Sequence, residues 1–129
     1  MSGDTPDDAL DADDRAVLQR ELTATQERVL VRLGALQRDF NEIVESSELA
    51  PPDDEHDPEG VTIAYERAQV SALLDQARED VAALELALRR LAEGSASRCE
   101  CCGGPITMER LMALPQARTC IACASSRRR

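Results

Sequence analysis

Residues 99–123 read CECCGGPITMERLMALPQARTCIAC and carry the most specific pattern in the chain. Two Cys-x-x-Cys pairs, Cys99 with Cys102 and Cys120 with Cys123, are separated by seventeen residues. This spacing is typical of a four-cysteine zinc site, in which each short turn brings two sulfurs to within about 2.3 Å of one ion. Because four thiolates complete the tetrahedron that zinc prefers, we expect one structural ion with no open position for metal-assisted catalysis.

The chemistry of these cysteines depends on the compartment. No apolar run approaches the roughly 18 residues of a membrane helix, and the start of the chain lacks the basic region of a secretory signal. We therefore expect a cytoplasmic protein, in which thiols stay reduced and bind metal rather than form disulfides. A fifth cysteine, Cys101, has two open interpretations: a spare thiol, or a redox-responsive neighbour that competes for zinc when oxidised.

The chain before the cysteines has helical periodicity in two segments. Apolar residues recur every three or four positions from about residue 12, and again after residue 60. The positions are Leu18, Leu22, Val29, Leu33, Leu36, Phe40 and Ile43 in the first segment, and Val70, Leu74, Ala77, Val81, Leu84, Leu88 and Leu91 in the second. Two helices of roughly 30 to 35 residues with one apolar stripe each are most simply buried as an antiparallel coiled-coil hairpin, although pairing between chains stays open.

These segments predict an all-α fold in three parts. Residues 1–11 are expected to be a disordered acidic leader, and residues 12–94 the helical hairpin, which Gly94 ends. Residues 95–129 are expected to form the four-cysteine zinc finger with a short C-terminal helix. An acidic tip loop at 45–60, rich in proline and glycine, joins the two helices and carries seven carboxylates and no arginine.

Overall charge narrows the classes of partner. The chain has 25 acidic and 15 basic residues, a formal net charge of −10. Such acidity opposes nonspecific binding to DNA or to an anionic membrane, so a basic protein surface or channel is the expected partner. The sequence offers neither a nucleophile with its base nor a phosphate-binding loop nor an open metal site, and we expect a protein that is not an enzyme.

The pattern around the cysteines resembles the DksA/TraR family of bacterial zinc-finger transcription regulators. The residues that carry the resemblance are Cys99-x-x-Cys102-Gly103, Pro105-Ile106, Arg110-Leu111-x-Ala113-x-Pro115-x-Ala117 and Cys120-x-x-Cys123. It implies a noncatalytic regulator that binds RNA polymerase through the secondary channel without contacting a specific DNA sequence. It also implies guanosine tetraphosphate as a co-regulator of some members, to which no residue of this sequence is assigned. The alternative is a coiled-coil and zinc-finger adaptor in another complex.

The resemblance further implies an acidic tip that approaches the active centre of the polymerase. The family's tip motif is an Asp-Pro followed by a second acid and an alanine. Here Asp57 matches the first acid, whereas Gly60 and Thr62 stand at the other two positions. Asp57 is therefore the first candidate for partner binding. Asp54 is the second, because it restores a pair of acids one register earlier.

Overall fold

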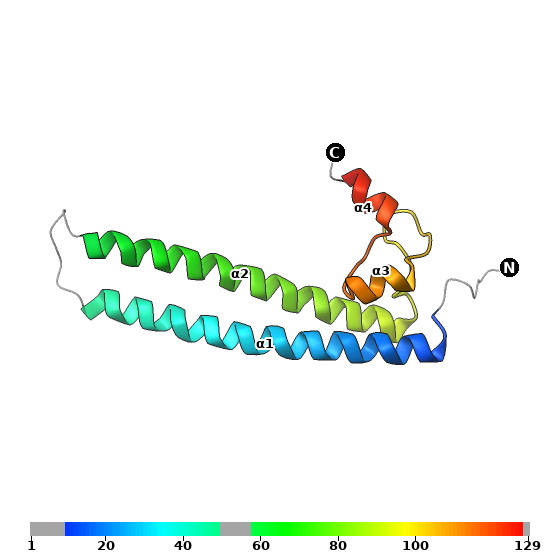
Figure 1. Ribbon diagram of the computed structural model, residues 1–129, viewed down its shortest axis with the longest axis horizontal. Helices are drawn as coiled ribbons and strands as arrows, with labels where there is room; N and C mark the ends of the chain where they lie inside the picture. Colours follow the sequence, from blue (N-terminus) through cyan, green and yellow to red (C-terminus); the bar gives the residue numbers. More distant parts are fainter. Residues whose placement is uncertain (1–9, 50–57, 128–129) are drawn as a thin grey trace. The chain divides into compact units, whose positions relative to one another are not determined.

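The computed structural model describes residues 10–49 and 58–127, which form four helices (Figure 1). They are α1 (Ala12–Leu49), α2 (Pro58–Glu93), α3 (Met108–Ala113) and α4 (Ile121–Arg127). Within these residues the strand-like pairing is limited to one isolated antiparallel bridge between Arg98 and Pro105. The predicted all-α fold is thus confirmed. A search of the same residues for a helix long and apolar enough to span a bilayer found none.

The chain divides into two compact units. One comprises Met1–Glu27 and Ala82–Arg129, and therefore holds the start of α1, the end of α2 and the C-terminal segment with α3 and α4. The other comprises Arg28–Val81, which holds the remainder of the two long helices. Within each unit the pieces of α1 and α2 lie side by side (Figure 1).

The first unit has the better covered core. Leu18 and Leu22 of α1 and Leu84 of α2 are fully buried, and Leu91 is nearly so. The Nη2 of Arg15 donates to the carbonyl of Leu91 at 3.3 Å, which joins the start of α1 to the end of α2. The two helices therefore run in opposite directions in this unit, as the predicted hairpin requires.

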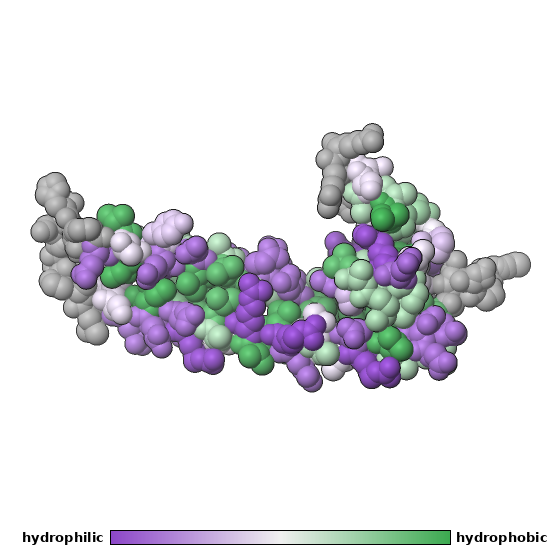
Figure 2. All heavy atoms as spheres, viewed as in Figure 1, coloured by the Kyte–Doolittle hydropathy of each residue, from purple (hydrophilic) through white to green (hydrophobic). Residues whose placement is uncertain are grey.

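The second unit is more open. Leu74 and Ala77 of α2 are buried, and the Nη2 of Arg78 donates to Oε1 of Gln37 on α1 at 3.0 Å. The other stripe positions of this unit are only half-buried; they are Val29, Leu33, Leu36, Phe40, Ile43, Val70 and Val81. Figure 2 shows hydrophobic surface among charged residues along the long helices on the face in view. The stripe predicted from periodicity is the stripe that packs, and the hairpin is confirmed.

The start of α1 is set by Asp11. Its Oδ1 accepts a hydrogen bond from the backbone N–H of Asp14 at 2.8 Å, which makes Asp11 the N-cap. Asp11, which we predicted to be the last residue of the disordered leader, is therefore part of the start of α1. Residues 1–9 lie outside the described residues.

The segment between the long helices is shorter than predicted. We expected a loop at 45–60, but α1 extends to Leu49 and α2 begins at Pro58. Proline suits the first turn of a helix, where its missing N–H has no partner to lose, and serine is only mildly unfavourable in a helix interior. Both predicted edges of the loop were wrong. Asp54 and Asp57 lie outside the described residues.

The end of α2 is set by Gly94, as predicted. Gly94 has a φ of 85°, a conformation that favours glycine. Its N–H donates to the carbonyl of Leu91 at 3.2 Å, and the N–H of Ser95 donates to the carbonyl of Arg90 at 2.8 Å. These two bonds form a Schellman motif, which turns the chain sharply from α2 into the cysteine-bearing segment.

Candidate metal centre

The first cysteine pair lies on a tight turn, residues 99–104. The N–H of Cys99 donates to the carbonyl of Gly104 at 2.7 Å, and the N–H of Gly103 donates back to the carbonyl of Cys99 at 3.0 Å. Gly103 has a φ of 75°, which this turn needs and glycine readily adopts. The N–H of Gly104 donates to Sγ of Cys102 at 3.3 Å. The turn therefore orients both sulfurs of the pair to the same side.

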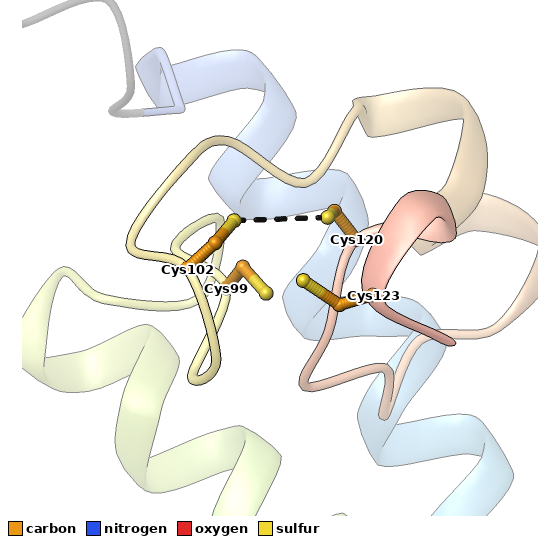
Figure 3. Close-up of side chains that lie close together, drawn as sticks. All are labelled: Cys99, Cys102, Cys120 and Cys123. Carbon is orange, nitrogen blue, oxygen red and sulfur yellow. Dashed lines mark hydrogen bonds between the residues drawn. The ribbon is translucent and has the colours of Figure 1, made fainter. Parts of the chain in front are cut away.

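The second pair spans the start of α4. Cys120 immediately precedes this helix and Cys123 lies in its first turn. The N–H of Ala124 donates to the carbonyl of Cys120 at 2.9 Å, which continues the helical pattern back to the first cysteine of the pair. One helical turn thus presents both sulfurs towards the first pair, as Figure 3 shows.

The four sulfurs meet the geometric requirement of a zinc site. The Sγ atoms of Cys99, Cys102, Cys120 and Cys123 all lie within 4.8 Å of one another. A tetrahedron with zinc–sulfur bonds of about 2.3 Å has edges of about 3.8 Å. The sulfurs of Cys102 and Cys120, one from each pair, are 3.8 Å apart (Figure 3). The cluster fits one structural zinc ion, as predicted from the spacing.

The thiols influence one another's protonation. Backbone N–H groups, chiefly that of Cys102, lower the pKa of Cys99 to about 6 against the opposing effect of burial. The backbone N–H of Cys123 does the most to lower the pKa of Cys120. The neighbouring sulfurs, first that of Cys120, raise the pKa of Cys123. Four thiolates crowded together repel one another, and a divalent cation relieves that repulsion.

The turn that carries the first cysteine pair and the residues just before the second pair are also joined by contacts that do not involve sulfur. The N–H of Glu100 donates to the carbonyl of Arg118 at 2.8 Å, and the side chains of the same two residues form an exposed ion pair at 3.7 Å. The Nε of Arg110, on α3, donates to the carbonyl of Thr119 at 2.9 Å. Consecutive carbonyls just before Cys120 are therefore fixed from two directions.

A small apolar core lies under these contacts. Ile106 and Leu111 are almost completely buried, and Ala117 is 7% exposed. Leu111 belongs to α3, whose first turn is capped by Thr107: its Oγ1 accepts from the N–H of Arg110 at 3.2 Å. Helix α3 thereby brings one apolar and one cationic side chain to the cysteine segment.

The segment is joined to α2 through a buried arginine. Arg90 is only 8% exposed, and its Nη2 donates to the carbonyl of Ser95 at 2.8 Å and to the carbonyl of Arg98. The N–H of Ile106 donates to the carbonyl of Ser97 at 2.7 Å. These bonds satisfy backbone groups of the chain directly after the Schellman motif and fix the first residues of the cysteine segment.

The structure brings together the four cysteines expected to bind zinc, and leaves Cys101 exposed outside the cluster. The predicted tip residues Asp57 and Asp54 lie outside the described residues. The C-terminal helix expected in the finger is α4.

Sequence reasoning missed three features of the site. The helix α3 could have been found, because Thr107 is a good N-cap and the residues from Met108 to Ala113 favour helix. The contact from Arg110 to the backbone before Cys120 has no signal in the local pattern. Nor does the burial of Arg90, which in sequence is an ordinary charged residue near the end of a helix.

Comparison with known proteins adds a family and a fold. No curated protein sequence matches the chain. The structure of transcription factor DksA2 from Pseudomonas aeruginosa has a similar fold, with a TM-score of 0.75 and 22% sequence identity over 92% of this chain and 85% of that one. Residues 94–129 match the family described as prokaryotic dksA/traR C4-type zinc finger, which confirms the resemblance predicted from the motif residues.

Proposed function

We propose that this protein is a noncatalytic transcription regulator that acts on RNA polymerase. The observation that carries the proposal is the DksA/TraR C4-type finger at residues 94–129. The fold likeness to DksA2, a protein described as a transcription factor, supports it. The formal charge of −10 also agrees with a protein partner that has basic surfaces rather than with direct binding to DNA.

In this proposal the two ends of the hairpin have different tasks. Cys99, Cys102, Cys120 and Cys123 hold one zinc ion, which supplies cross-links that a segment with so small an apolar core lacks. The acidic tip enters the secondary channel of the polymerase. There the carboxylates of Asp57 and Asp54 interact with basic groups or with a metal ion near the active centre.

Polymerase binding can be tested by capture. Immobilised full-length protein is incubated with purified core RNA polymerase, with and without a ligand that occludes the secondary channel. We expect capture of the polymerase and its loss when the channel is blocked. Capture that is unchanged when the secondary channel is blocked would contradict entry through that channel. No capture at all would favour an adaptor in another complex.

The tip is tested by transcription in vitro with purified polymerase. Asp54→Asn combined with Asp57→Asn is expected to abolish the effect on transcription while polymerase binding is kept. The matched control is Asp53→Asn with Glu55→Gln, which removes the same charge from the same acidic stretch. Equal losses in both variants would assign the effect to overall charge, and an unchanged effect in the first would remove the two aspartates from the mechanism.

A further inference from the structure

We propose that Arg110 is a positioning residue for the zinc site: through the carbonyl of Thr119 it holds the backbone that presents Cys120. Arg110 is not a ligand, and its side chain need not touch the metal. The inference rests on the zinc site alone and does not depend on what the protein binds.

The first step is the anchoring of Arg110 itself. It lies in α3, where its backbone N–H donates to the capping hydroxyl of Thr107. Its carbonyl accepts from the N–H of Leu114 at 2.8 Å. The next residue, Leu111, is 1% exposed and ties the helix to the apolar core. A half-buried guanidinium on so well fixed a backbone has little freedom to move.

The guanidinium of Arg110 holds the peptide group that precedes Cys120. Its Nε–H donates to the carbonyl of Thr119, the peptide group shared with Cys120, at 2.9 Å. A hydrogen bond from a charged donor is stronger than one between neutral groups. Arg110 and Cys120 also line the same surface hollow.

The carbonyl of Arg118 is held by a bond that does not involve the side chain of Arg110. The carbonyl of Arg118, one residue earlier, accepts from the N–H of Glu100, which lies between the cysteines of the first pair. That bond uses only backbone atoms, so no substitution other than proline at position 100 deletes its donor or acceptor. The bond to Thr119 depends on one side chain. Arg110 is therefore the point at which the orientation of Cys120 can be changed without altering a ligand or the backbone bond between the pairs.

The prediction is a loss of zinc retention. Groups that orient metal ligands from outside the coordination sphere typically contribute about 10- to 100-fold to metal affinity. Arg110→Gln in the full-length, zinc-loaded protein should release zinc to a colorimetric chelator about 10- to 100-fold faster than the wild type. The matched control is Arg118→Gln, which makes the same change at an exposed arginine whose partner is Glu100 across 3.7 Å. It should release zinc at nearly the wild-type rate.

Two further readouts separate positioning from a general loss of stability. Cobalt(II) at saturation should give a shifted visible absorption spectrum in Arg110→Gln, because the tetrahedral sulfur environment is distorted. Arg110→Lys, whose ammonium can also donate to a carbonyl, should recover part of the retention. If Arg110→Gln lacks the amide spectrum of a folded finger, Arg110→Lys is compared with Arg118→Lys, and the former should again release zinc faster.

Three results would overturn the inference. One is zinc release from Arg110→Gln at the wild-type rate, and another is equally faster release from both glutamine variants, which would reflect the loss of one positive charge. A wild-type cobalt spectrum in Arg110→Gln together with a lysine variant no better than glutamine would show that the hydrogen bond does not set the geometry of the sulfurs.

Discussion

At the scale of single residues, the finger depends on one leucine. Leu111 is 1% exposed and is the buried residue of α3. Leu111→Ala removes apolar contacts and leaves a cavity, and is expected to cost about 2–5 kcal/mol of the finger's stability. Amide hydrogen exchange in the zinc-loaded protein measures this loss. Met112→Ala, at a neighbour that is 38% exposed, is the control and should change stability by about 0.5 kcal/mol or less.

The thiols give a second prediction at this scale, on the coupling of zinc to protons. In the folded finger the pKa of Cys99 is lowered to about 6 and that of Cys123 is raised. The zinc-free finger is expected to be unfolded, so its thiols start near their ordinary pKa of about 8.5, and zinc binding at neutral pH should release close to four protons per ion. Calorimetry in buffers of different ionisation enthalpy measures the number.

The sign of the pH dependence follows from the same groups. Below the ordinary thiol pKa of about 8.5, the unfolded zinc-free segment holds a proton on each of the four sulfurs, so protons compete with zinc for all of them. The apparent zinc affinity should therefore fall steadily as the pH is lowered from about 8 to about 6. Competition titrations with a chelator across this range measure the slope. A release of clearly fewer than four protons at neutral pH would show that the finger stays folded without zinc and that the lowered pKa of Cys99 persists there.

At the scale of elements, we expect the same substitution to alanine to have opposite effects on stability at two glycines. Gly94 ends α2 with a φ of 85°, and a Cβ there meets no atom within 4 Å, so the cost of Gly94→Ala is conformational, about 1–2 kcal/mol. Gly34 lies inside α1, where a Cβ would make an ordinary 3.6 Å contact with Arg38. Gly34→Ala should stabilise by about 0.5–1 kcal/mol. Urea denaturation followed by circular dichroism measures both, and effects of the same sign would show that local helix geometry does not control them.

The elements also show how far a sequence can predict this structure. The stripe from Leu18 to Leu91 was predictable because helical periodicity over many turns is a strong signal, and the cysteine spacing defined the metal cluster. Helix ends were harder to predict, because proline disrupts the interior of a helix but suits its first turn. Pro58 stands at the first residue of α2, where we had expected loop. The contacts of Arg90 and Arg110 were not predictable, because each joins a side chain to a carbonyl whose position only the folded chain fixes.

At the scale of the whole molecule, net charge governs association. With a formal charge of −10, binding to a basic partner should be steered by long-range attraction and weakened by salt. If RNA polymerase is the partner, its association rate should fall as sodium chloride is raised, more than its dissociation rate rises. Stopped-flow measurements of the two rates test this. An association rate insensitive to salt would show that electrostatic steering plays no part.

The final prediction concerns the separate stability of finger and hairpin. Helices α1 and α2 contain 38 and 36 residues and bury their own leucines, whereas α3 and α4 contain 6 and 7 residues. A segment with so little apolar core depends on its metal for folding, and the hairpin does not. Chelation of zinc should therefore unfold the finger while far-ultraviolet circular dichroism retains most of its helical signal.

Two cysteine variants make that test specific. Cys102→Ser removes a sulfur of the cluster and should lose zinc and the finger's amide protection together. Cys101→Ser changes an exposed cysteine one position earlier, outside the cluster, and should keep both. A finger that stays protected after zinc has left would show that its apolar core folds it unaided. A hairpin that melts with the finger would show instead that the contacts of Arg90 at the end of α2 couple the two into one cooperative structure.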